Sequence, residues 1–89
     1  MVINMNQNLL KIYIKNLSLL DVKKIANKYN ITLNDNEASS VFNYIKDNHD
    51  KYFNGYLDID SIIKDASLIL SKDNFNKLLY IYLKYKENN

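Results

Sequence analysis

Residues Ser18 to Ile45, SLLDVKKIANKYNITLNDNEASSVFNYI, decide the fold because they hold two helical patterns joined by one short polar turn. Ser18 is a good N-cap for the first helix, and Asp21 occupies the capping-box position three residues later. Asn30 tolerates a positive φ angle, so it indicates where this helix stops, just after Tyr29. The first half of the stretch therefore predicts one capped helix.

The second half predicts another helix, entered from an extended connector at residues 31–33. Asn34 offers its N-cap and Glu37 completes a second capping box, so we expect a helix from Asp35 to about Asn48. The apolar side chains of the stretch recur at helical spacing or lie in the connector, and we expect them in the core. They are Ile25, Ala26, Tyr29, Ile31, Leu33, Val41 and Ile45.

Three further helical patterns surround this centre. The broad apolar arc of residues 3–17 predicts a helix that ends near Asn16. Asp58 or Asp60 is expected to cap a helix over residues 59–70, and Ser71 is expected to cap the last one. Residues 49–58 contain an Asn-Gly pair and predict the longest loop, with a small hairpin of 51–53 against 56–58 as an alternative. The core stripe of the last helix is Phe75, Leu78, Leu79, Tyr82 and Tyr85. The predicted fold class is all-α, a compact bundle of four to five short helices.

Length and composition bound the class of protein. A chain of 89 residues with 47% hydrophobic content fits a single helical domain over residues 1–89. The absence of cysteine excludes disulfides, thiolate zinc sites and a cysteine nucleophile. The sequence shows neither a secretory leader nor an apolar run long enough to span a bilayer, so we expect a cytoplasmic protein without a membrane partner.

A basic face is the main evidence for nucleic-acid binding. Lys23, Lys24 and Lys28 line one side of a helix whose Ile25-Ala26 pair and following turn resemble a helix-turn-helix. However, residues 33–37 lengthen that turn and place acidic side chains at the end that would enter the DNA groove. The net charge is only +2 and all basic residues are lysines. A nucleic-acid-binding module using residues 18–45 is therefore the alternative function, and a solvated lysine face is favoured.

The sequence contains only weak signals of metal binding or catalysis. Residues 50–61, DKYFNGYLDIDS, resemble a calcium-binding EF-hand loop, but Tyr52 and Ser61 stand where oxygen ligands are required. His49 is the single histidine, and we expect it to end its helix or to interact with the helix dipole. We find no phosphate loop, nucleophile motif or paired acid and base. We therefore expect no enzyme activity, no metal or other cofactor, and no small-molecule substrate.

The last helix carries an aromatic surface. Tyr80, Tyr82, Leu83 and Tyr85 give it more apolar area than one neighbouring helix can cover, and tyrosine is favoured at interfaces. Either the first helix covers this surface within the monomer or a partner does, and the sequence leaves both alternatives open. The predicted function is a protein-interaction module or a homo-oligomer.

The chain also resembles a family of short bacterial proteins that is defined only as a domain of unknown function. The resemblance rests on capping and packing residues along most of the chain: Ser18-Leu19-Leu20, Ala26, Tyr29 to Leu33, Glu37-Ala38, Val41, Tyr52-Phe53, Ser71, Phe75, Leu78 and Leu79. Where the family is expected to show Ser-Pro, this chain has Ser71-Lys72, and it has Lys and Asn where the family is richer in Arg and Gln. The resemblance implies an architecture and carries over no site residue.

Overall fold

The computed structural model describes residues 7–88, which form five helices and no strand. In chain order they are α1 (Gln7–Lys15), α2 (Leu19–Lys28), α3 (Asp35–Phe53), α4 (Ile59–Ile69) and α5 (Lys72–Glu87). The predicted all-α bundle is confirmed. The predicted first helix is seen from Gln7 onward, and its earlier residues lie outside the described part.

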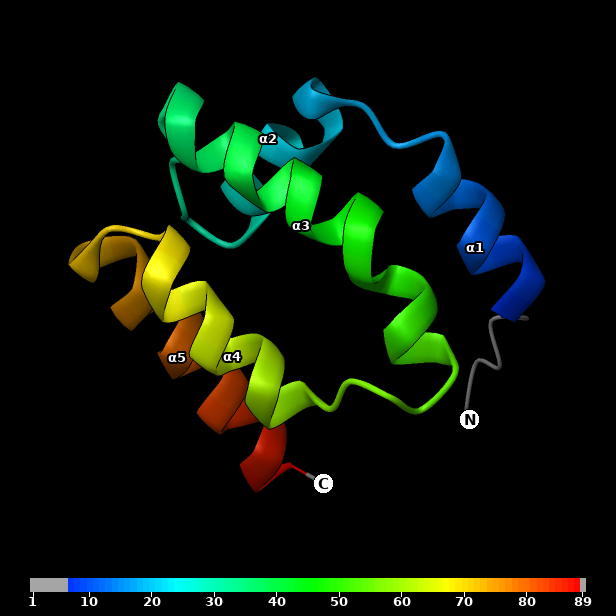
Figure 1. Ribbon diagram of the computed structural model, residues 1–89. Coiled ribbons are helices and arrows are strands. Elements are labelled where there is room, and N and C mark those ends of the chain that lie inside the picture. Colours follow the sequence, from blue (N-terminus) through cyan, green and yellow to red (C-terminus); the bar gives the residue numbers. More distant parts are fainter. Residues whose placement is uncertain (1–6, 89) are drawn as a thin grey trace.

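The longest helix, α3, is the centre of the molecule (Figure 1). Helices α1, α2 and α4 pack against α3, whereas α5 packs against α4. Helix α1 lies on one side of α3, and the α4–α5 hairpin lies on the other. The described residues thus form an N-terminal three-helix unit and a C-terminal helical hairpin.

The predicted N-caps are confirmed. The Ser18 Oγ accepts a hydrogen bond from the Asp21 backbone N–H at 3.1 Å, and the Asp21 carboxylate accepts one from the Ser18 N–H at 3.0 Å. Asn34 and Glu37 form the same reciprocal box at the start of α3, while Asp58 and Ser71 cap α4 and α5. Each cap satisfies a backbone N–H that has no acceptor inside its own helix.

Both helices of the central stretch end in the same type of turn. At the end of α2, Asn30 adopts φ 64° as predicted, and the Ile31 N–H donates to the Ala26 carbonyl at 3.0 Å. At the end of α3, Gly55 adopts φ 82° and the Tyr56 N–H donates to the Lys51 carbonyl at 2.8 Å. These bonds define Schellman motifs, in which a left-handed residue closes the helix.

The second motif corrects the prediction for residues 49–58. Helix α3 continues through His49 and ends at Phe53, instead of stopping near Asn48. Residues 49–53 contain no glycine or proline to break the helix, and the Asn-Gly pair terminates it. The alternative of a small hairpin is wrong because residues 51–53 are helical.

The buried apolar core lies where the N-terminal unit folds on the connector. It consists of Leu17, Val22, Ile31, Leu33 and Ala38, with Ala38 fully buried. The predicted core position of the connector is confirmed, and Ala26, Val41 and Ile45 pack against this cluster. Ile25 and Tyr29 are exposed, contrary to prediction. Val22 and Ala26 form the side of α2 that reaches the core, and Tyr29 is the C-cap residue beyond the last helical turn.

Candidate functional site

The predicted interface residues of α5 divide into two pairs. Tyr80 and Leu83 are three residues apart, so they share one side of the helix, where they are 64% and 51% exposed. The Lys84 Nζ lies 5.6 Å from the centre of the Tyr80 ring, within range of a cation–π contact. Tyr80, Leu83 and Lys84 line a shallow surface hollow with Lys86 and Glu87. This side of α5 faces away from the core.

The second pair, Tyr82 and Tyr85, lies on another side of α5. Tyr82 is half-buried, and its hydroxyl donates a hydrogen bond to the Asp60 carboxylate on α4, which raises the pKa of Tyr82. Tyr85 follows Leu78 and Ile81 at helical spacing, yet it is 62% exposed because no described residue covers it. The four residues therefore do not form one continuous patch.

Helix α1 does not cover this surface. Within residues 7–88, the backbones of α1 and α5 make no close approach, and α3 lies between them (Figure 1). Helix α1 instead packs on α3 and leaves Leu9, Ile12 and Tyr13 exposed. Of the two alternatives for the α5 surface, coverage by the first helix is thus wrong for the part of the chain that is described.

The predicted lysine face of α2 is partly neutralised. Lys23 forms an ion pair with Asp35 at the start of α3, which lowers the pKa of the Asp35 carboxyl. Lys24 and Lys28 are exposed, and neither forms an ion pair with any described residue. Two of the three predicted lysines thus remain outside ion pairs, and the charge of Lys24 still acts on the Asp21 carboxyl.

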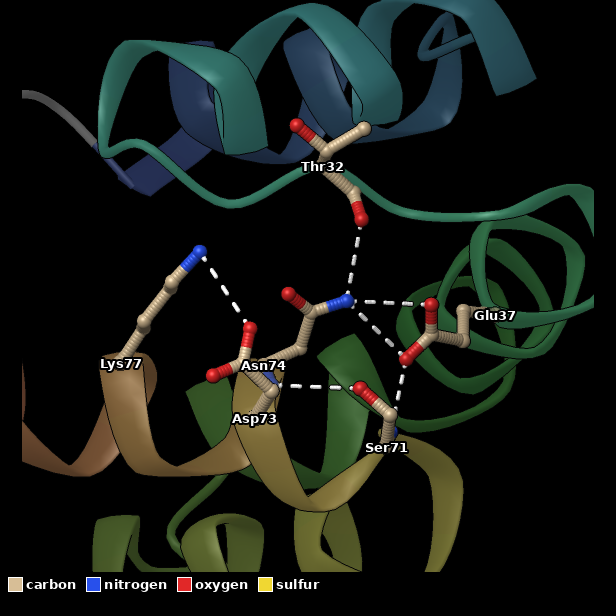
Figure 2. A network of polar contacts seen from close by, with 6 residues as sticks. All are labelled: Thr32, Glu37, Ser71, Asp73, Asn74 and Lys77. Atoms are coloured by element: carbon tan, nitrogen blue, oxygen red, sulfur yellow. Dashed lines mark hydrogen bonds and ion pairs between the residues drawn. The ribbon is translucent and has the colours of Figure 1, made fainter.

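A buried polar network, which the sequence did not reveal, joins α3 to α5 (Figure 2). The Glu37 carboxylate accepts hydrogen bonds from the Ser71 N–H at 2.7 Å and from the Asn34 N–H at 3.0 Å. It also accepts from the Asn74 amide, at 3.1 and 3.2 Å to its two oxygens. The same amide donates to the Thr32 carbonyl at 3.0 Å. We call Glu37, Ser71 and Asn74 the polar joint.

One carboxylate thus serves two helix starts. Asn34 and Ser71 are the N-cap residues of α3 and α5, and the positive ends of both helix dipoles favour a negative charge there. Burial of the Glu37 carboxyl raises its pKa, but hydrogen bonds from Ser71, Asn34 and Asn74 outweigh this effect and leave the pKa below its ordinary value of 4.5. Glu37 is therefore buried in its ionised form.

A second polar contact joins α3 to α4. The Tyr44 hydroxyl donates to the Asp65 carboxylate at 2.6 Å. Burial and the neighbouring Asp65 raise the pKa of Tyr44 to about 12. Polar contacts thus hold the hairpin to α3 at two positions along that helix, Glu37 and Tyr44.

The sequence signal for the polar joint was incomplete. Glu37 was predicted only as a capping residue, although its second carboxylate oxygen also reaches Ser71 across the fold. Asn74 stands four residues before Leu78, so it shares the side of α5 that faces the core. A polar residue at such a position signals a buried partner.

The histidine and the acidic side chains of residues 7–88 are the candidates for metal binding, because the chain has no cysteine. This part of the chain holds no cluster of three or more histidine and acidic side chains that could bind a metal ion. Of the two predicted placements of His49, the end of the helix is wrong, because α3 continues to Phe53. The His49 Nδ1 lies 3.0 Å from the Ile45 carbonyl oxygen within α3. No helix in the described part is long and apolar enough to cross a membrane.

Fold and surface together define a small all-α protein with a buried polar joint and exposed apolar helix faces. Residues 2–85 match the model of the family DUF2624, described as a protein of unknown function. The chain belongs to this family, in agreement with the resemblance seen in its capping and packing residues. No curated protein and no solved structure matches the chain.

Proposed function

We propose that this protein is a non-catalytic protein-interaction module whose contact surface is the outer side of α5, at Tyr80 and Leu83. One observation carries the proposal: this apolar surface is exposed, and α1 lies too far away to cover it. Exposed apolar side chains that cluster on one helix face are typical of protein contacts, and tyrosine adds large area at low entropic cost. A second copy of the chain is the first partner to test.

The experiment compares a loss of apolar side chains on the proposed surface with a loss outside it. Light scattering at micromolar concentration should show an assembly larger than a monomer, and replacing Tyr80 and Leu83 together by serine should shift it to the monomer. Leu68→Ser is the control, because Leu68 is 85% exposed on α4 and lies outside the proposed surface. This variant should assemble like the wild type.

If the wild type is a monomer, the same variants test a heterologous partner. A protein captured from native lysate supports the proposal only if Leu68→Ser retains it and the Tyr80/Leu83 variant loses it. A strict monomer that captures no partner in this comparison would contradict the proposed function.

The lysine face does not lead us to propose nucleic-acid binding. Affinity for nucleic acid depends on the number of phosphates that lysines neutralise. Lys23 is paired with Asp35, which leaves Lys24 and Lys28 for such contacts. Salt titration of binding to duplex and single-stranded probes would test this alternative, which requires a steep loss of affinity as salt rises.

A further inference from the structure

The two parts of the molecule are buried to different degrees. The buried apolar cluster is made of side chains from α2, α3 and the segments that precede them. Within the described chain, α4 has no buried residue, and the one buried residue of α5 is polar Asn74. Leu70, Leu78 and Ile81 pack against the cluster from the hairpin, but each is only partly buried. The hairpin therefore adds little fully buried apolar surface.

Polar contacts also attach the hairpin to α3. Glu37 receives hydrogen bonds from Ser71 and Asn74, and Tyr44 donates one to Asp65. When such contacts separate, water can solvate the freed groups, so their net contribution to stability is much smaller than their strength in isolation. Apolar contacts, by contrast, lose their stabilisation when water enters.

The covalent link between the two parts is short and contains the single glycine of the chain. Residues 54–58 connect α3 to α4, and Gly55 in this link adopts φ 82°, a conformation that glycine reaches without strain. Adding a Cβ to Gly55 would meet no atom within 4 Å, so backbone conformation is what the position requires. Small changes in φ and ψ here can reorient the whole hairpin.

We propose that the α4–α5 hairpin is a hinged arm that opens as a unit at residues 54–58, and that the Glu37 carboxylate is the latch that holds it closed. Opening separates Ser71 and Asn74 from Glu37 and uncovers Leu70, Leu78 and Ile81 together with the apolar cluster beneath them. Helices α2 and α3 keep their shared core in the open state. This device is independent of the outer side of α5, which is exposed in either state.

A matched pair of substitutions at Ser71 tests the latch. Ser71→Pro removes the N–H that donates to Glu37, and the φ of −58° at Ser71 already suits proline. Leu70 before it has φ −90° and ψ 151°, a conformation allowed before proline. Ser71→Ala is the control, because it also loses the Oγ that caps Asn74 but keeps the N–H.

Hydrogen exchange followed by mass spectrometry is the readout. A lost hydrogen bond to a charged group should raise the open population of Ser71→Pro over Ser71→Ala roughly tenfold or more. Detached from α3, helices of 11 and 16 residues are marginally stable in water, so they fray in the open state and their amides should exchange faster by that factor. Peptides from α2 should exchange equally in both variants. Equal exchange of α4–α5 in the two variants, or equal acceleration of α2 and α5, would overturn the proposal.

If Ser71→Pro does not fold, Asn74→Leu replaces it. This variant removes the amide bonds to Glu37 and Thr32, whereas Asn76→Leu makes the same change at an exposed position of the same helix. Faster exchange of α4–α5 in Asn74→Leu, with α2 unchanged, would support the latch. Identical exchange in the two leucine variants would overturn it.

Discussion

Glu37 and Ala38 are neighbours in the chain, yet they belong to two differently built regions. Ala38 lies in the apolar cluster that joins α2, α3 and the connector, where it is fully buried. Glu37 belongs to the polar joint, where its carboxylate holds the start of α5. The first region is stabilised by removing apolar area from water, and the second by hydrogen bonds whose net contribution is small. The first turn of α3 therefore holds α2 and the connector strongly, through apolar contacts, and holds α5 weakly, through hydrogen bonds.

The largest effect on the free energy of unfolding should come from a substitution that shortens a side chain of the apolar cluster. Leu33→Ala deletes a buried side chain of the cluster and should lower the free energy of unfolding by about 2–5 kcal/mol. Leu68→Ala makes the same deletion at an exposed position and should change it by at most ~0.5 kcal/mol. Chemical denaturation measures both values, and similar losses in the two variants would show that the cluster is not the main source of stability.

A smaller effect should come from neutralising the latch. Glu37→Gln replaces one acceptor oxygen by an NH₂ group beside the donors of Ser71 and Asn74, and should cost about 1–3 kcal/mol at neutral pH. Asp47→Asn is a matched control, since Asp47 is an exposed carboxylate on the same helix. Its unfolding free energy at neutral pH should stay close to that of the wild type.

The same variant should also change the response to acid. The folded pKa of Glu37 is below its ordinary value of 4.5, so its contribution is fully present above pH 4.5 and is lost as pH falls through the folded pKa. The wild type should therefore lose stability below pH 4.5 more steeply than Glu37→Gln. Parallel pH profiles of the two proteins would contradict an ionised, hydrogen-bonded Glu37.

The smallest effect should be a gain of stability at the start of α5. Lys72 is the first helical residue, so its N–H has no acceptor within the helix, and Ser71 before it is already extended at ψ 159°. Lys72→Pro should therefore stabilise the protein by about 0.4–1 kcal/mol, through lower entropy of the unfolded chain. Thermal unfolding would measure the gain, and a lower midpoint than the wild type would show that the start of α5 does not tolerate this rigid residue.

Local sequence signals predicted the elements well because their causes are local. Ser18 with Asp21, Asn34 with Glu37, and Ser71 all cap the helices that they were expected to start. Asn30 stops α2 because the left-handed conformation is decided within a few residues. The length of α3 was underestimated, since an Asn-Gly pair can close a helix as well as turn a hairpin.

Features that depend on distant segments were not predictable in the same way. The two partners of Glu37 at the start of α5 stand 34 and 37 residues later in the chain, and no periodic pattern specifies such a bond. The division of the α5 surface into Tyr80 with Leu83 and Tyr82 with Tyr85 depends on where α4 lies. Likewise, the separation of α1 from α5 follows from the packing of both parts around α3.

Native-state hydrogen exchange of the wild type at low denaturant tests the contrast between the two regions most directly. Amides of α5 should exchange through an opening of lower free energy and weaker denaturant dependence than amides of α2, because the detached arm frays while the apolar cluster of α2 and α3 stays folded. The same opening free energy and the same denaturant dependence in α2 and α5 would contradict the account, since the two regions would then open as one cooperative unit.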